Sequence, residues 1–267
     1  NSKMKITIFT SNQPRHISLI NKLSLICEEV YAIQECNTVV PGQVEDFFKK
    51  SQVMQDYFSK VMAAEEKFFK SKDFLNTNVR SLSIKNGDLN FLTKKELLPA
   101  LDSNIYVIFG SSFIKGWLIK FLIEKKALNI HMGLSPYYRG SSCNFWALYD
   151  NNPEYVGATV HLLSEGLDSG PILYHCLPNL KKETPFEFTM KSVLAAQESL
   201  VSRIKQNEIN FREAISQNKN EEVRYTRNKN FTDQVALEFL NRKLNNQILK
   251  EIISQREYPE LINPFFL

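Results

Sequence analysis

The first forty residues alternate between two kinds of apolar pattern. Residues 5–10 are a β-branched and aromatic run typical of a strand, and Ile17, Ile20 and Leu23 follow it at helical spacing. Residues 30–33 return to a strand pattern. A strand, a helix and a second strand in this order normally form a parallel unit with a right-handed crossover. The sequence therefore predicts an open, mostly parallel α/β sheet flanked by helices.

The rest of the chain continues this alternation. Further strands are expected at residues 105–109, 128–131, 158–163 and 171–175, and helices at 113–124 and 184–206. We expect one main domain over residues 4–209, with a partly helical insertion at 41–100. A small C-terminal region at 210–267 follows, with a strand near 222–225 and a helical stretch near 231–254.

Composition excludes several classes of protein. With 43% hydrophobic and 23% charged residues, the chain is an ordinary globular sequence, and its net charge of +4 suits a small anionic ligand without demanding nucleic acid. No apolar run is long enough to span a bilayer, and the first residues lack the apolar core of a secretory signal. The four cysteines have neither metal-site nor disulfide-framework spacing. We therefore expect a cytoplasmic protein with no membrane partner and no metal.

Glycines indicate where a site could lie. Seven of the nine glycines fall between residues 110 and 170, most of them in expected loops. A chain so poor in glycine would use it there for tight turns or for close approach to a ligand. Ligands in open α/β sheets lie beyond the carboxyl ends of strands, and the loops after Phe109, His131 and Leu163 are expected to meet that condition.

Three polar residues near these loops suggest chemistry. Asn129 and His131 are two apart on an expected strand, so their side chains share a face. A histidine can take a proton near neutral pH while an amide donates to a developing oxyanion, which are the services that acyl transfer to an amine requires. Asp168 could stabilise the imidazolium. Spacing alone favours a structural interpretation, in which Asn129 caps a turn, His131 is a satisfied polar residue and Asp168 forms an Asx-turn.

A longer set of motifs surrounds these residues. The set comprises Asn129–Gly140 (NIHMGLSPYYRG), Trp146–Leu148 (WAL), Gly157–His161 (GATVH) and Glu165–Leu173 (EGLDSGPIL). In order and spacing it resembles the core of the 10-formyltetrahydrofolate-dependent formyltransferases, closely over residues 104–175 and loosely over 4–35. The segment Met132–Ser135 departs from the family pattern, which puts the local turn in doubt but not the catalytic residues.

The resemblance implies a Rossmann-like domain that binds 10-formyltetrahydrofolate as formyl donor and passes its formyl group to an amine. It implies that the catalytic residues are Asn129, His131 and Asp168. It also implies two walls of a folate site, one formed by Gly110, Ser112, Phe113 and Ile114, and the other by Glu165, Gly166 and Leu167.

The acceptor site is expected elsewhere, and each of its residues has a structural alternative. Arg15 and His16 follow the first strand and could meet a substrate phosphate or only begin a helix. Tyr137, Tyr138 and Arg139 could form an acceptor wall, although aromatic residues in a turn more often pack. His161 and His175 alternate with apolar neighbours on strands, which favours a structural role.

The family's subgroups differ in their acceptors. The glycine-rich loop of glycinamide ribonucleotide formyltransferases is replaced by Thr10–His16, and residues 210–267 are only weakly basic, unlike the tRNA-binding domain of methionyl-tRNA formyltransferases. The sequence is therefore most similar to sugar N-formyltransferases. These act on nucleotide-linked 4-amino dideoxy sugars for surface-glycan biosynthesis, without nucleic acid, and the C-terminal region could support a homodimer. Two alternatives stay open: a methionyl-tRNA formyltransferase-like enzyme, and a non-catalytic folate- or nucleotide-sugar-binding module.

Overall fold

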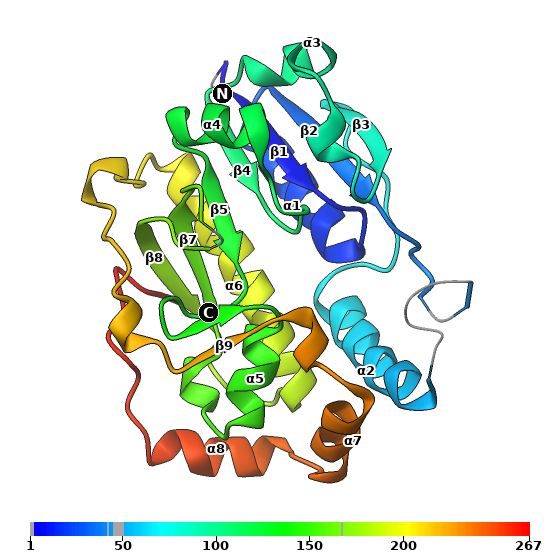
Figure 1. Ribbon diagram of the computed structural model, residues 1–267, viewed down its shortest axis with the longest axis vertical. Coiled ribbons are helices and arrows are strands. Elements are labelled where there is room, and N and C mark those ends of the chain that lie inside the picture. Colours follow the sequence, from blue (N-terminus) through cyan, green and yellow to red (C-terminus); the bar gives the residue numbers. More distant parts are fainter. Residues whose placement is uncertain (1–2, 42, 45–50, 167) are drawn as a thin grey trace.

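A single eight-stranded sheet organises the computed structural model, which describes residues 3–41, 43–44, 51–166 and 168–267 (Figure 1). The strand order is β10-β8-β7-β5-β4-β1-β2-β3. These strands are β1 (Lys5–Thr10), β2 (Glu29–Cys36), β3 (Val79–Lys85), β4 (Ile105–Ile108), β5 (Leu128–His131), β7 (Ala158–Leu162), β8 (Ile172–Leu177) and β10 (Phe265–Phe266). From β3 to β5 all neighbours are parallel, whereas β7 is antiparallel to both β5 and β8. The predicted open, mostly parallel sheet is confirmed.

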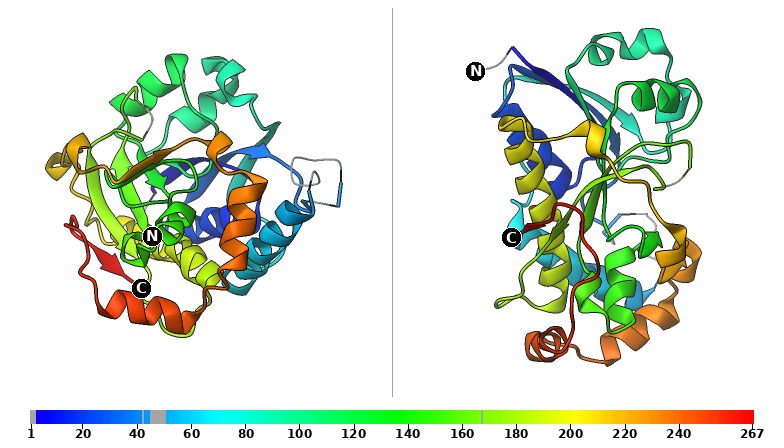
Figure 2. Two further views of the ribbon diagram at one scale, coloured as in Figure 1. Left: turned by 60° about the horizontal axis from the view of Figure 1, so that its bottom comes forward. Right: turned by 90° about the vertical axis from the view of Figure 1, so that its left-hand side faces the viewer.

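Helices cover both faces of the sheet (Figure 2). One face packs against α1 (Pro14–Ser24) and α6 (Pro185–Lys205), and the other against α4 (Gly116–Glu124) and α3 (Lys94–Leu97). The helix α6 begins as its sequence predicts, because Pro185 occupies the first turn and Thr184 and Glu187 form a capping box. None of the helices in the described parts of the chain has the length and apolarity of a membrane span.

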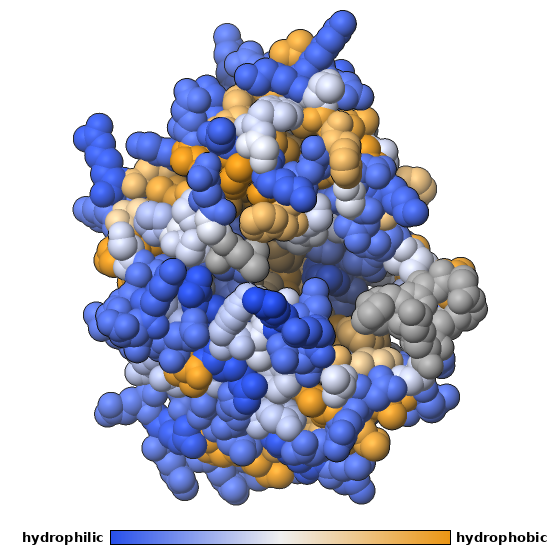
Figure 3. Space-filling model, in the orientation of Figure 1, coloured by the Kyte–Doolittle hydropathy of each residue, from blue (hydrophilic) through white to orange (hydrophobic). Residues whose placement is uncertain are grey.

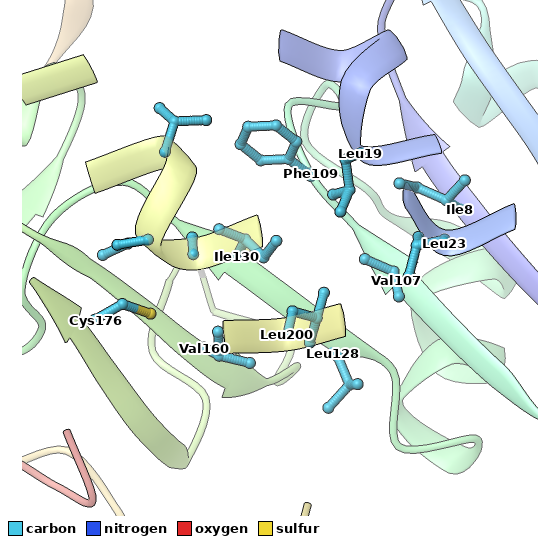
Figure 4. Packing of buried hydrophobic residues seen from close by; sticks show 14 of the residues in the cluster. Ile8, Leu19, Leu23, Val107, Phe109, Leu128, Ile130, Val160, Cys176 and Leu200 are labelled. Atoms are coloured by element: carbon cyan, nitrogen blue, oxygen red, sulfur yellow. The ribbon is translucent and has the colours of Figure 1, made fainter. Parts of the chain in front are cut away.

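The largest core lies between the sheet and α1 with α6. Figure 4 shows Leu128 and Ile130 of β5 in this layer, close to Leu200 of α6. Alternation along a strand sends Asn129 and His131 to the opposite face. That face carries the α4 cluster, which includes Ile108 and Ile114.

The remaining elements surround the carboxyl edge of the parallel strands. They are α2 (Gln52–Phe68), α5 (Cys143–Tyr149), α7 (Asp233–Asn241), α8 (Asn246–Ser254), and a small sheet of β6 (Tyr138–Gly140) with β9 (Arg224–Thr226). Residues 210–267 run down one side and across the bottom of the molecule in Figure 1. They contribute β9, α7, α8 and β10, and β10 joins the main sheet beside β8.

Two segments differ from what their local sequence indicates. Residues 79–85, within the segment expected to be a partly helical insertion, form β3, the edge strand beside β2. The strand is mostly exposed and its sequence is largely polar, so it lacks the apolar run that marks a buried strand. Residues 137–139 are not only a turn either, because Tyr138 and Arg139 begin the short strand β6.

Candidate active site

Strand β5 and the loop after β7 bring the three candidate catalytic residues together. His131 is 7% exposed, and its Nδ1 lies 3.5 Å from Oδ2 of Asp168. Asp168 has a φ of +50°, in the left-handed region. Gln217, from the C-terminal region, fixes this conformation by donating to the backbone oxygens of Asp168 and Gly170, each at 2.8 Å.

The loop that carries Asp168 does not leave the sheet where the sequence predicted. Because β7 runs antiparallel to β5, Leu162 at its carboxyl end pairs with Leu128 at the start of β5. The loop therefore leaves from the amino end of the parallel strands, and the expectation that it extends from their carboxyl ends is wrong. It still brings Asp168 back along the sheet face to His131.

Two of the four histidines are held in the neutral form by burial and by hydrogen bonds to the backbone. Burial, and then the charge of Arg15, lowers the pKa of His16 well below its ordinary value, and its Nδ1 accepts a hydrogen bond from the Gln13 backbone N–H at 3.1 Å. Burial likewise lowers the pKa of His175. Its Nδ1 accepts from the backbone N–H of Ile262 at 2.9 Å. A proton on either Nδ1 would set two donors against each other.

His161 is also neutral, and it is hydrogen-bonded to the side chain of Asn129. Its Nδ1 lies 2.7 Å from the carbonyl oxygen of Leu162, so the ring proton sits there. Its Nε2 must then accept, and the Asn129 amide nitrogen donates to it at 3.0 Å. Burial lowers the pKa of His161, which keeps this acceptor available. One N–H of Asn129 is used in this bond and one is left for a ligand.

His131 differs from the other three histidines because both ring nitrogens face acceptors. Nδ1 faces the Asp168 carboxylate, and Nε2 lies 3.4 Å from the carbonyl oxygen of Tyr138. The Cys143 thiol, 3.5 Å from Nε2, can donate to the neutral ring. Burial raises the pKa of that thiol, so it stays protonated. Within the described residues, His131 is therefore the one of the four histidines with a carbonyl or carboxylate oxygen within 3.5 Å of each ring nitrogen.

Apolar neighbours on the strand favour a structural role for His161, and its hydrogen bond to Asn129 is not visible in the sequence. The signal is the antiparallel register that pairs Asn129 with His161, and that register is set by the sheet rather than by local sequence. Its Nε2 is also 3.9 Å from Oδ1 of Asp168, which places His161 beside the His131–Asp168 pair.

The two loops expected to bind folate start close together. Ile114 is buried in the α4 cluster, and Leu163, at the start of the Asp168 loop, packs against the same cluster. Phe113 is 51% exposed, and Glu165 and Gly166 are exposed, whereas Leu167 lies outside the described residues. Both loops thus start at the α4 cluster, on the face of the sheet that carries Asn129 and His131.

Gly110 starts the first of these loops and has no room for a side chain. Its φ is +76°, and a Cβ there would lie 2.5 Å from Nε2 of His16. Ser112 is held by hydrogen bonds from both its backbone N–H and its hydroxyl to the carboxylate of Glu35.

A pocket of about 730 Å³ opens at the carboxyl edge of the sheet. Figure 3 shows a hollow near the centre of the molecule in this view. The three candidate catalytic residues do not line the pocket themselves, but its lining includes Met132, next to His131, and Cys143, whose Sγ lies 3.5 Å from Nε2 of His131. Aromatic rings from α2, α5, α6 and the C-terminal region form much of its wall: Tyr57, Phe58, Phe145, Phe186, Phe231 and Phe239.

Residues predicted to meet the acceptor divide between this pocket and the core. Arg15 and His16 line the pocket, but Arg15 pairs with Glu65 at 2.6 Å and His16 is a neutral, buried imidazole. The structure thus gives no support to a phosphate role for His16.

Tyr137, Tyr138 and Arg139 are likewise occupied within the chain. The Tyr137 hydroxyl donates to the Glu260 carbonyl and the Tyr138 hydroxyl to Asp150, while Arg139 pairs with Glu222. Both tyrosine side chains are buried, so they pack as core residues rather than forming an open wall. No group of side chains within the described ranges has the composition of a metal site.

A family model matches most of this chain, and individual proteins match it in sequence over shorter stretches. Residues 4–204 match a family model described as formyl transferase. A methionyl-tRNA formyltransferase of Thermosynechococcus vestitus is 36% identical over 78 residues, which cover 29% of this chain and 23% of that protein. Formyltetrahydrofolate deformylase 2, mitochondrial, of Arabidopsis thaliana is 30% identical over 99 residues, which cover 37% of this chain and 28% of that protein. The match therefore spans about a quarter of the length of these curated relatives.

Solved structures resemble the chain over most of its length. A 4-N formyltransferase from Francisella tularensis has a TM-score of 0.53 at 18% identity, covering 86% of this chain and 79% of that one. A phosphoribosylglycinamide formyltransferase from Anaplasma phagocytophilum has a TM-score of 0.51 at 16% identity, covering 85% of this chain and 99% of that one. At such identities the likeness establishes the fold.

Proposed function

The chain belongs to the formyl transferase family, and from this membership we propose that it transfers a formyl group from 10-formyltetrahydrofolate to the amino group of a nucleotide-linked amino sugar. The observation that carries the proposal is the pairing of an oriented amide with a buried histidine that faces a carboxylate. Asn129 supplies the first and His131 the second. Formyl transfer to an amine needs a donor to the developing oxyanion and an acceptor for the amine proton at the same carbon.

The residues fit a folate donor in two respects. Loops 110–115 and 163–170 rise from one apolar base, and Phe113 offers an exposed ring beside backbone groups. A flat heteroaromatic ring with a polar edge suits such walls. We therefore assign donor binding to Gly110, Ser112, Phe113 and Ile114, opposite Glu165 and Gly166. When bound, 10-formyltetrahydrofolate supplies an activated formyl carbon.

The chain's own residues then have three tasks. The free N–H of Asn129 donates to the formyl oxygen, and His161 keeps the amide turned for this purpose. His131 removes the proton that the acceptor amine must lose as its nitrogen bonds to the formyl carbon. The same proton then goes to the folate nitrogen as the bond between that nitrogen and the formyl carbon breaks. Asp168 stabilises the resulting imidazolium through Nδ1, in the way that a carboxylate supports histidine in acyl transfer.

The acceptor pocket supports a small molecule. Its volume of about 730 Å³ lies within the range of small-molecule sites, roughly 300–1,000 Å³. Phe231 and Phe239 of the C-terminal region form part of its lining, so that region contributes to the pocket. A folded tRNA end would need an open approach lined by cations. The pocket thus favours a sugar nucleotide over an aminoacyl-tRNA.

A panel of nucleotide-linked amino sugars, incubated with 10-formyltetrahydrofolate and the enzyme, tests the proposal. We expect at least one sugar to gain the mass of a single formyl group. Formylation of an aminoacyl-tRNA alone, weakening steeply with salt, would instead establish the tRNA alternative. Binding of folate with no product from any amine would identify a non-catalytic module.

A further inference from the structure

Glu35 is a buried carboxylate that the proposed chemistry does not use. It is the penultimate residue of β2 and is 1% exposed. Its Oε1 accepts from the backbone N–H of Ser112 at 2.7 Å. Its Oε2 accepts from the Ser112 hydroxyl and from the backbone N–H of Gly87, both at 2.8 Å. Burying an ionised group is costly unless its hydrogen bonds are made, so these three bonds fix the positions of their donors.

The same residue joins three loops at the carboxyl edge of the sheet. The side chain holds the loop after β4 through Ser112 and the turn after β3 through Gly87. Its backbone carbonyl accepts from the hydroxyl of Ser11, in the loop after β1, at 2.6 Å. Glu35 therefore sets the spacing between segments that meet only in the folded protein.

Asn90 holds the other end of loop 110–115. Its side-chain nitrogen donates to the carbonyl of Phe113 at 2.6 Å, and its side-chain oxygen accepts from the backbone N–H of Lys115 at 2.9 Å. Asn90 follows β3 in a single 3₁₀ turn, Leu89–Phe91. Two side chains from outside the loop thus hold it from Ser112 to Lys115.

We propose that Glu35 and Asn90 are positioning residues that hold loop 110–115 in the conformation that binds the formyl donor. This inference rests on the proposed function, because it assumes that the loop contacts the folate. It gives residues 79–91, part of the segment expected to be an insertion, a defined task. That task is to brace the donor loop rather than to touch the donor.

The physical basis is preorganisation. A loop that binds through backbone groups must offer them in one arrangement, and each freely rotating residue adds an entropic cost to binding. A loop held by hydrogen bonds at Ser112, Phe113 and Lys115 is already ordered in the folded protein, so binding does not have to order it. Loss of a brace should therefore weaken donor affinity more than it weakens the fold.

Binding of tetrahydrofolate, measured by calorimetry, tests the proposal together with the melting temperature. Glu35→Gln keeps the shape of the side chain but replaces one acceptor oxygen by a donor that faces another donor. Asn90→Ala removes two bonds from a half-exposed side chain, so this variant should fold. Glu154→Gln is the matched control, because Glu154 is also a buried carboxylate but pairs with Arg256 near α8.

We expect Glu35→Gln to raise the Kd for tetrahydrofolate by about tenfold or more, the size of one lost hydrogen bond to a charged group. Asn90→Ala should shift it in the same direction. Glu154→Gln should lower the melting temperature and leave the Kd within about twofold of wild type. Wild-type affinity in both Glu35→Gln and Asn90→Ala would overturn the inference. Failure of the wild-type protein to bind tetrahydrofolate would instead overturn the proposed function.

Discussion

The protein should lose stability as the pH falls from 7.5 to 5.5, because three histidines are buried in the neutral form. Burial lowers the pKa of His16, His161 and His175 below the ordinary value of 6.5. In each, one ring nitrogen accepts from an N–H that cannot become an acceptor. All three imidazoles can be protonated in the unfolded chain, whereas burial disfavours their protonation in the folded protein.

The sign and size follow from this difference. Stability falls with falling pH wherever the unfolded state binds more protons than the folded state. The loss begins as the pH passes below 6.5 and continues towards the lowered pKa values of the folded state. A histidine that stays neutral in the folded protein at pH 5.5 loses about 1.4 kcal/mol of stability there, so the three together lose at most about 4 kcal/mol. That is a large part of the roughly 5–15 kcal/mol that stabilises an ordinary domain.

Urea unfolding followed by circular dichroism at pH 7.5, 6.5 and 5.5 measures this loss. His175→Gln should reduce the pH dependence, since it removes one of three contributions of the same sign. His131→Gln should leave the contribution of the three neutral histidines unchanged. Equal stability at pH 7.5 and 5.5 would refute the account of the neutral histidines, as would a pH dependence that vanishes in His131→Gln.

Three further changes test the site. Asn129→Ala should reduce turnover by about 100-fold or more, the usual effect of losing an oxyanion donor, and near-normal turnover would remove its assigned role. His161→Phe should reduce turnover by about tenfold or more because the amide loses its orienting acceptor, while His161→Gln should recover part of it; equal rates in the two variants would argue against orientation. Gly110→Ala should cost about 1–3 kcal/mol in urea unfolding because of its φ of +76° and the clash with His16, and unchanged stability would contradict that geometry.

Local pattern was enough to predict most of the sheet. Strands such as 105–109 carry unbroken apolar runs because both faces of a parallel sheet are covered. The edge strand β3 is mostly exposed and has no such apolar run, so its sequence does not predict a strand. The direction of β7 was also not predictable, because strand orientation depends on the whole connection rather than on the strand itself.

The candidate catalytic residues could be named from sequence only through a family resemblance. Their spacing permits a structural interpretation, and the residues that prepare them leave no local signal. His161 orients Asn129 through strand register, and Glu35 reaches Ser112 across 77 positions. The pocket is still less visible, since its aromatic wall combines α2, α5, α6 and the C-terminal region. Contacts that arise only on folding define these features.

The central claim is that Asn129, His131 and Asp168 act on one carbon, and Asp168→Asn tests it most directly. The amide keeps the size of the side chain but cannot stabilise a protonated imidazole. Turnover should be measured by the mass of formylated acceptor at saturating donor, alongside tetrahydrofolate affinity and melting temperature. The account predicts a fall in turnover of about 100-fold or more, with folate affinity and folding retained. Turnover close to wild type in a folded variant would contradict it.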